Sequence, residues 1–472
     1  MDPPVLSRRA LERTDTYGHL ESKVFAQSSD VVRAHLSLAL WAGLAGWTPS
    51  GVRAAPPGYT FKAVAFLGDA APGGGAYIND FEPGSISNRG EVSFVADLTT
   101  ATTEGVFLVR QGTVSEVLRA GQAAPGGGTF EFGSLGRAAL NEEGDLAIVF
   151  LLSPFTLPLG ANAGVYFYSH TNNTLTALVV PSVTPAPGGG TFQGAGVSAN
   201  VNNRGEVVFP GVVPTTAGIS GTLGIGVFRA AKNGQISIVA APGDPAPGGG
   251  TFDFAQSPWI NDGGDVAFGA HVAGETCFDF GIPQTVRIFC AESVYFQKAA
   301  TGAIQSIAHQ GAPAPGGGTY RFAFGPVINS RGDVVFIGGL SPASDTGADL
   351  GVFLFSKNST VSIARPGDPM PGGGALATAS LVNNNYSLNN RGEAAFNAAL
   401  NTGEHALYVA NHGALILVAK TGMVIPGVGT IDKLDMLGAP TPSGGVILND
   451  RGQILFGASL VGGGGVMLVA TP

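Results

Sequence analysis

Charged residues are scarce in this sequence. Asp, Glu, Lys and Arg make up 12% of its 472 residues, against roughly 25% in a typical soluble domain. The apolar fraction is 44%, so the chain can bury enough surface to fold and is not expected to be disordered. The formal net charge is −9. Because no basic stripe accompanies it, nucleic acid is not an expected partner.

Cysteine and histidine are also rare, which argues against several kinds of active site. Cys277 and Cys290 have no zinc-ligand spacing, so no metal site is predicted. The sequence contains no HExxH, GxSxG, EF-hand or phosphate-loop pattern, so no cofactor is predicted. His271, His309 and His405 fall near expected strand ends and are weak candidates for a general base. A structural or solvated role is the simpler explanation for each.

The apolar run Leu36–Trp47 is shorter than the about 20 residues that a membrane span needs. Val52–Ala54 follows it, with small residues at the two positions that a signal peptidase inspects. We therefore expect residues 1–54 to be an N-terminal extension and signal peptide, and the mature chain to be secreted or periplasmic without a membrane span. The long polar front suggests a translation start near Val31 or Val32. A buried or disordered N-terminal helix is the alternative.

Export to an oxidising compartment would favour a disulfide between the two cysteines. Cys277 and Cys290 lie in one insertion, and in an exported protein they are predicted to form a disulfide across that loop. Two inert thiols are the alternative.

Glycine, in contrast, is abundant, with 73 residues, and much of it falls in a repeat. The pattern apolar-Asn-x-x-Gly-acidic-apolar-x-Phe occurs seven times at a period of about 60 residues. Ser87 replaces the Asn in the first copy and Ile148 the Phe in the second. The copies begin at Ile86, Leu140, Val201, Ile260, Ile328, Leu388 and Leu448. Seven copies in register indicate a repeat architecture.

Each repeat reads as four strands, A to D. In the fifth, residues Phe324–Ile328, Asp333–Leu340, Gly351–Phe355 and Thr360–Arg365 are the expected strands. Asn-x-x-Gly suits a tight A–B turn, because Asn bonds to its own backbone and Gly takes the positive φ. These two residues therefore have a sufficient structural explanation. Strand B is apolar on both parities, at Val334, Val335, Phe336 and Ile337, as expected when both faces of a sheet pack on neighbours.

The ends of the chain indicate how the ring closes. The sequence ends on a strand C, Gly465–Ala470, with no strand D after it, while Phe61–Leu67 reads as a strand D without a repeat of its own. Pairing the two would complete the seventh sheet and remove an exposed edge. The predicted fold is all-β, a seven-bladed β-propeller over residues 55–472, with four antiparallel strands per blade and the ring closed by the N-terminal strand. An open solenoid is the alternative, but it would need capping units.

The motif set resembles an exported bacterial tandem-repeat family named for its NxxGxxxF repeat, from Tyr59 to the C-terminus. Members often carry a C-terminal anchoring segment. This chain ends at Pro472 without a hydrophobic tail, so we expect it to be released. The resemblance implies fold and export and brings no assigned activity.

Functional residues are expected where the D–A and B–C connections meet, because B–C loops vary between repeats and variable loops on a rigid scaffold carry specificity. After each Gly-Gly-Gly-Thr-aromatic stretch or its variant stands one residue that changes from blade to blade. In blade order these are Ile78, Glu131, Gln193, Asp253, Arg321, Ala377 and Asp432. Glu131, Gln193, Asp253, Arg321 and Asp432 are therefore predicted to bind a ligand around the axis. A solvated rim without a ligand is the alternative.

Two functions remain open. The first is a monomeric binding module for an extracellular polymer, glycan or protein, which binds through the D–A/B–C face. The second is a propeller hydrolase or lyase acting on a polysaccharide or ester. A histidine within hydrogen-bond reach of a carboxylate in a pocket would favour the enzyme.

Overall fold

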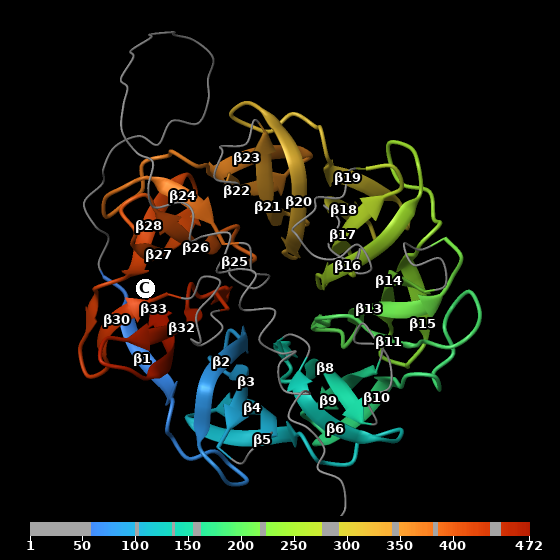
Figure 1. Ribbon diagram of the computed structural model, residues 1–472, viewed down its shortest axis with the longest axis horizontal. Helices are drawn as coiled ribbons and strands as arrows, with labels where there is room; N and C mark the ends of the chain where they lie inside the picture. Colours follow the sequence, from blue (N-terminus) through green and yellow to red (C-terminus); the bar gives the residue numbers. More distant parts are fainter. Residues whose placement is uncertain are drawn as a thin grey trace, which may run out of the picture.

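Seven small antiparallel sheets stand around a central axis (Figure 1). This computed structural model describes residues 58–99, 103–134, 137–153, 162–217, 223–275, 292–341, 349–380, 386–434 and 445–472. All secondary structure in those ranges is strand and turn, with no helix. The predicted seven-bladed β-propeller is therefore confirmed. The predicted signal peptide lies outside the described residues.

The first four blades are built from consecutive stretches of the chain. Blade 1 contains β2 (Tyr77–Ile86), β3 (Val92–Leu98), β4 (Thr103–Arg110) and β5 (Thr113–Arg119). Blade 2 contains β6 (Thr129–Ser134), β7 (Ala139–Leu140), β8 (Leu146–Ser153), β9 (Ala163–Ser169) and β10 (Thr174–Val179). Blade 3 contains β11 (Gly194–Ala195), β12 (Asn200–Val201), β13 (Val207–Pro214), β14 (Leu223–Ala230) and β15 (Ile236–Ala240). Blade 4 contains β16 (Phe252–Ile260), β17 (Val266–Val272), β18 (Ser293–Gln297) and β19 (Ile304–Ala308).

The last three blades complete the ring. Blade 5 contains β20 (Thr319–Ile328), β21 (Val334–Ser341), β22 (Leu350–Ser356) and β23 (Ser359–Ala364). Blade 6 contains β24 (Leu376–Ala379), β25 (Tyr386–Leu388), β26 (Ala394–Leu400), β27 (His405–Asn411) and β28 (Ala414–Lys420). Blade 7 contains β29 (Val424–Ile425), β30 (Gly429–Lys433), β31 (Ile447–Leu448), β32 (Ile454–Leu460) and β33 (Gly465–Thr471), together with β1 (Thr60–Phe66) from the N-terminal side.

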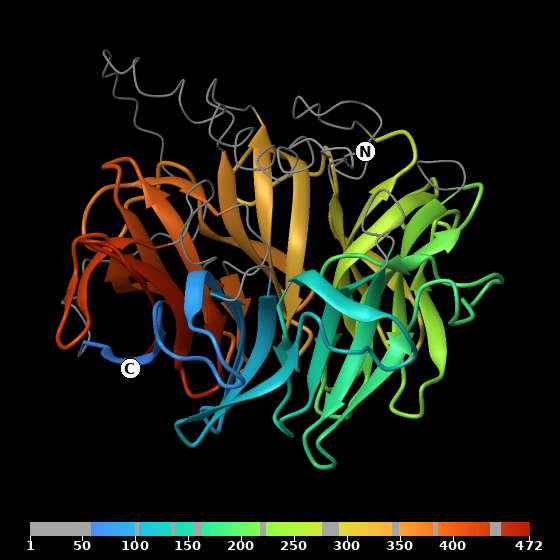
Figure 2. The same cartoon turned by 60° about the horizontal axis from the view of Figure 1, so that its bottom comes forward.

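Strand β1 closes the ring as predicted. It pairs antiparallel with β33, from Thr60 opposite Thr471 to Phe66 opposite Val466. Figures 1 and 2 both show this blue strand beside the red strands of the last blade. Hydrogen bonds therefore join the two ends of the propeller chain, and β33 has no free edge.

Strand B packs on both neighbouring blades, which explains its continuous apolar sequence. In β21, Val334 and Phe336 join a buried cluster with residues of blade 4. Val335 and Ile337 point to the other face and pack with residues of blade 6. All four are at most 1% exposed, because successive strand residues face opposite sides.

Strand A is longer and less regular than predicted. In blade 5 it begins at Thr319 instead of Phe324, and its pairing with β21 shifts between Phe324 and Val327. Gly325, at φ +62°, and Pro326 cause the irregularity, because proline has no N–H to donate to the ladder. Four of the other strands A are divided into two short pieces within the described ranges.

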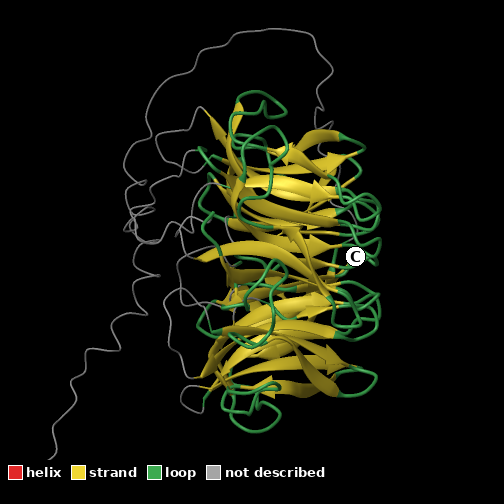
Figure 3. Ribbon diagram, turned by 90° about the vertical axis from the view of Figure 1, so that its right-hand side faces the viewer, coloured by secondary structure: helices red, strands yellow, loops and turns green. Residues whose placement is uncertain are grey.

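The two ends of the propeller are built differently (Figure 3). The A–B and C–D turns lie at one end, here called the turn end, together with the C-terminus. The D–A and B–C connections lie at the opposite end, called the loop end. The sequence places the motif turns, which keep one length, at the turn end and the variable connections at the loop end.

Candidate functional site

At the turn end, residues from all seven motif copies surround a cavity of about 330 Å³ on the axis. In six copies the motif Asn donates a hydrogen bond from Nδ2 to a backbone carbonyl of the next blade. The links run from Asn141 through Asn202, Asn261, Asn329 and Asn389 to Asn449, and from there to Ser87, at 2.9–3.1 Å. The motif Asn therefore fastens each blade to its neighbour.

The next residue of each motif forms a second circle. The backbone N–H of Asn88 donates to Glu142 Oε1 at 2.9 Å, and that of Glu142 donates to Asn203 Oδ1 at 2.8 Å. The N–H of Asp450 donates to Asn88 Oδ1 at 2.8 Å and completes the circle. Burial, with the charges of Asp450 and Glu91, raises the pKa of Glu142 against the lowering effect of its bond to Asn88. Because these polar atoms bind one another, the circle is a structural closure.

The Arg, Gly and acidic positions of the motif also link blades. Arg331 Nη2 lies 2.7 Å from Asp333 Oδ2, which also accepts a bond from Asn329. The same guanidinium covers the motif glycine of the next blade, and a Cβ on Gly392 would displace the end of this flexible side chain. Gly392 also has φ +84°, a conformation that other residues rarely adopt. The positive φ thus explains the glycine, and the structural explanation of the motif is supported.

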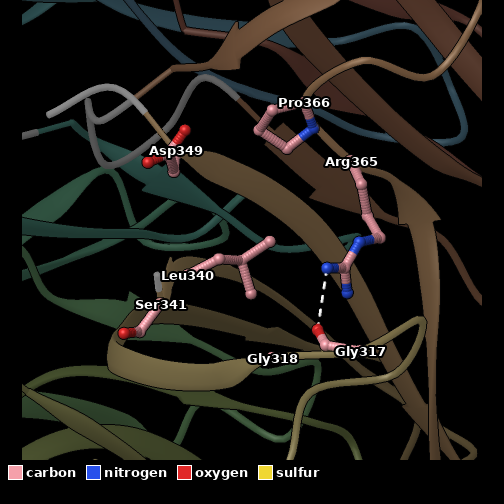
Figure 4. A pocket seen from close by; sticks show the side chains of 7 residues that line it. All are labelled: Gly317, Gly318, Leu340, Ser341, Asp349, Arg365 and Pro366. Carbon is pink, nitrogen blue, oxygen red and sulfur yellow. Dashed lines mark hydrogen bonds between the residues drawn. The ribbon is translucent and has the colours of Figure 1, made fainter. Parts of the chain in front are cut away.

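The loop end carries a second cavity. It has a volume of about 200 Å³ and lies entirely in blade 5 (Figure 4). Gly317 and Gly318 come from the D–A connection before β20, and Leu340 and Ser341 from the end of β21. Asp349 precedes β22, and Arg365 and Pro366 follow β23. Four segments thus bring a guanidinium, a carboxylate, a hydroxyl and two apolar side chains to one small space.

Backbone carbonyls hold the guanidinium of Arg365 in place. Nη2 donates to the carbonyl of Gly317 at 2.8 Å, the bond drawn in Figure 4, and Nη1 donates to the carbonyl of Pro315. The backbone N–H of Arg365 is bound by Asp368 Oδ2 at 2.8 Å. Both ends of this residue are therefore fixed before any ligand arrives, which lowers the entropic cost of binding.

Arg365, Asp349 and Ser341 were not among the predicted ligand-binding residues. The repeat does contain a signal for one of them. Arg119 in blade 1, Lys420 in blade 6 and Arg365 occupy the same place, six residues before Pro125, Pro426 and Pro371 of the Pro-Gly-Gly-Gly stretch or its variant. A comparison of the repeats at that position would have selected Arg365, whereas Asp349 and Ser341 gave no such signal.

The five predicted ligand-binding residues all lie at the loop-end start of strand A. Asp253, Arg321 and Asp432 stand at register shifts of strand A, where an extra residue is inserted. Glu131 lies in the irregular stretch after Phe130. The amide of Gln193 donates to the backbone carbonyl and hydroxyl of Thr191. Such bulges often re-aim a side chain near functional sites. Whether the five side chains bind one ligand stays a prediction.

One of these residues partners a predicted histidine. His271 Nδ1 lies 3.0 Å from Asp253 Oδ2, across β16 and β17. The ring of Phe254 stacks on the imidazole with centroids 5.7 Å apart and planes inclined by 8°. His271 is only 2% exposed, and neither it nor Asp253 lines the blade-5 or the axial cavity. The pair has the geometry of an imidazole base oriented by a carboxylate, but it does not face either of these two cavities.

The other two histidines also lie at the loop end. His309 is exposed, and its Nδ1 lies 3.0 Å from the carbonyl of Gln310. His405 begins β27, where burial lowers its pKa and its Nδ1 lies 3.3 Å from the carbonyl of Leu434. Each histidine thus contacts a backbone carbonyl, as a structural side chain does.

An acid with a buried carboxyl group, which sequence reasoning missed, lies where blades 4, 5 and 6 meet. Glu292 Oε1 accepts a bond from the amide of Gln256, and no described residue binds Oε2. The backbone carbonyl of Glu292 accepts the N–H of Ala323 at 2.8 Å. Burial raises the pKa of Glu292 to about 7. The position shows no repeat signal, because it ends the irregular B–C connection of blade 4.

A buried cation near the axis was also missed. Arg137 lies 3.8 Å from the centre of the Trp259 ring and donates to Asn200 Oδ1 at 2.6 Å. Burial lowers the pKa of Arg137 to about 9, although the charge of Glu82 opposes this shift. Its position links blades 2, 3 and 4. We assign it a packing role, because it lines neither the blade-5 cavity nor the axial cavity.

The predictions on the disulfide, on metal binding and on a membrane span remain to be compared with the structure. Cys277 and Cys290 lie outside the described residues. Within the described ranges, no three His, Cys, Asp or Glu side chains are grouped to hold a metal ion. The same ranges contain no helix with the length and apolar character of a membrane span.

The fold is a seven-bladed propeller whose turn end is closed by hydrogen bonds of the repeat motif and whose loop end carries a cavity in blade 5. The chain belongs to DUF7453, a family of unknown function, whose model matches residues 57–293 and 290–467. No curated protein matches the chain.

Solved structures share only the broad fold. An oligogalacturonate lyase in complex with manganese is 13% identical, with a TM-score of 0.48, and the match covers 88% of this chain and 96% of that one. A Mycobacterium tuberculosis puromycin-hydrolyzing peptidase is 14% identical, with a TM-score of 0.47, and the match covers 86% of this chain and 53% of that one. TolB from Acinetobacter baumannii is 10% identical, with a TM-score of 0.35, and the match covers 79% and 77%. None of these likenesses is close enough to transfer an activity.

Proposed function

We propose that this chain is an exported carbohydrate-binding propeller, which holds one sugar unit of an extracellular polymer in the blade-5 cavity. The observation that carries the proposal is the set of side chains lining that cavity. Arg365 donates hydrogen bonds, the carboxylate of Asp349 accepts them, and the hydroxyl of Ser341 does both. A sugar matches all three, because each of its hydroxyls both donates and accepts.

Size and shape agree with this ligand class. The volume of about 200 Å³ is below the roughly 300–1,000 Å³ of cavities that enclose drug-sized ligands. One ring, with the rest of the polymer outside, is therefore a suitable occupant. Leu340 and Pro366 supply apolar surface for the C–H face of such a ring. Glu131, Gln193, Asp253, Arg321 and Asp432, at the same end, would contact neighbouring units.

The test is a glycan and polysaccharide binding screen of the full chain, with Ser341→Trp filling the cavity. Ser153→Trp is the matched control, because Ser153 pairs with Thr129 in blade 2 as Ser341 pairs with Thr319 in blade 5. We expect binding to be lost in Ser341→Trp and kept in Ser153→Trp. Equal binding by both variants, or no carbohydrate bound by the wild type, would reject the proposal.

A propeller hydrolase or lyase is the second candidate, and the His271–Asp253 pair favours it. A carboxylate that accepts from Nδ1 orients an imidazole as a general base. The test is product release from the best-bound polysaccharide by wild type and His271→Ala. Turnover that the substitution abolishes would select the enzyme. Binding without turnover would select the binding module.

A further inference from the structure

The D–A connections are held by a basic residue that recurs in the repeat. Arg119 Nη1 and Nη2 donate to the carbonyls of Gly74 and Pro72 at 3.0 and 2.6 Å. Lys420 Nζ lies 3.5 Å from the carbonyl of Gly372. Arg365 binds Pro315 and Gly317 in the same way. Each basic side chain thus clamps the glycine turn that precedes its own blade.

Two of these three cations have an acidic partner. Arg119 Nη2 lies 2.8 Å from Glu116 Oε2, and Lys420 Nζ lies 3.1 Å from Glu404 Oε1. No carboxylate oxygen of the described residues lies within 4.0 Å of the guanidinium of Arg365. Arg365 is therefore the clamp whose charge no described acid neutralises.

The sequence difference between blade 5 and blade 1 lies at a single position. Glu116 is opposite Phe107 in blade 1, and Ser362 is opposite Phe353 in blade 5. Both positions come three residues before the clamp arginine. Where blade 1 has the carboxylate that neutralises its clamp, blade 5 has a hydroxyl. The clamp whose guanidinium or ammonium has no carboxylate partner among the described residues is also the one that lines the cavity.

We propose that the unit held in this cavity carries an oxyanion, either carboxylate or sulfate, which binds the guanidinium of Arg365. The inference rests on the proposed carbohydrate function and deepens it. A planar guanidinium binds such groups with charge-assisted bonds, roughly twice as strong as neutral ones. Asp349, from the segment before β22, would accept a hydroxyl of the same unit.

Titration calorimetry tests this with glucose, glucuronate and a sulfated hexose as probes. Wild type is expected to prefer the two acidic sugars. Arg365→Gln should weaken them by about 10- to 100-fold, the equivalent of one charged hydrogen-bond pair, and change glucose binding less than about twofold. Ser362→Glu rebuilds the blade-1 arrangement and should produce the same selective loss with Arg365 still present. Arg119→Gln is the matched control and should bind like wild type.

The possible outcomes separate the two claims. Wild type could bind neutral and acidic sugars equally, and Ser341→Trp could abolish both. That result would overturn the charge inference but leave the carbohydrate site in place. The charge inference would also be overturned if the Ser362→Glu variant bound acidic sugars as tightly as the wild type does. Binding of only one of the two acidic sugars would identify the source of the oxyanion and support it. No sugar binding at all would overturn both claims.

Discussion

The side chain of Asn449 donates a hydrogen bond of 2.9 Å to the backbone carbonyl of Ser87, and so joins the last blade to the first. These residues are 362 positions apart in the sequence. The same bond recurs between the other blades, except from blade 1 to blade 2, because Ser87 is too short to make it. Closure of the ring is thus a property of the repeat motif, reinforced by the pairing of β1 with β33.

Two single substitutions at the motif Asn position should change the free energy of unfolding in opposite directions. Ser87→Asn adds the missing link and should stabilise the protein by about 0.5–1.5 kcal/mol. Asn389→Ser copies blade 1 and should cost about 1–3 kcal/mol, because it removes the bond to the carbonyl of Asn449 and leaves buried groups without partners. Chemical denaturation measures both. Destabilisation by Ser87→Asn would show that blade 1 does not share the geometry of the others.

Most of the fold could be predicted from the repeat in the sequence. Asn-x-x-Gly identified the turns, and the missing strand D after Gly465–Ala470 identified the closing strand. The bulges of strand A were not predicted, because Gly325 and Pro326 act through local backbone geometry. The blade-5 cavity was missed since its residues are separated in sequence and only Arg365 repeats elsewhere.

The buried carboxyl of Glu292 should make stability depend on pH. Burial raises its pKa to about 7, above the value of about 4.3 in an unfolded chain. The folded state therefore binds this proton more tightly, so its stabilising contribution is full below about pH 4.3 and is lost as the pH rises to about 7. The free energy of unfolding should fall by on the order of 3 kcal/mol across that window through this group.

Glu292→Gln removes the titrating group and keeps the shape of the side chain. Its stability at pH 8 should exceed that of wild type, and the slope between pH 5 and pH 7 should flatten. Denaturation at a series of pH values measures both, with Glu143→Gln at the exposed turn end as control. Parallel profiles for wild type and Glu292→Gln would contradict the assignment.

The cysteine pair gives a prediction about the exported protein. Cys277 and Cys290 should be oxidised in protein collected after export, since the destination is predicted to be oxidising. Closing so short a loop should contribute on the order of 3 kcal/mol at most. Intact-mass measurement with and without reduction tests the bond. Two free thiols in the exported protein would refute it.

The predicted polar residues around the loop end should matter for long ligands more than for single units. Asp253→Asn and Asp432→Asn together should weaken polymer binding several-fold and leave the affinity for one sugar unit unchanged. Thermal stability should change by less than about 0.5 kcal/mol, since the amide oxygen introduced at position 253 can still accept from His271. Affinity electrophoresis and calorimetry on the same samples provide the comparison. Unchanged polymer affinity would leave the blade-5 cavity as the whole site.

The location of the ligand is the central claim, and a crystal structure of the full chain with its tightest-binding monosaccharide tests it most directly. The account predicts one sugar in the blade-5 cavity, with oxygens bonded to Arg365, Asp349 and Ser341. A sugar bound in the axial cavity of the turn end, or beside His271 and Asp253 with the blade-5 cavity empty, would contradict it.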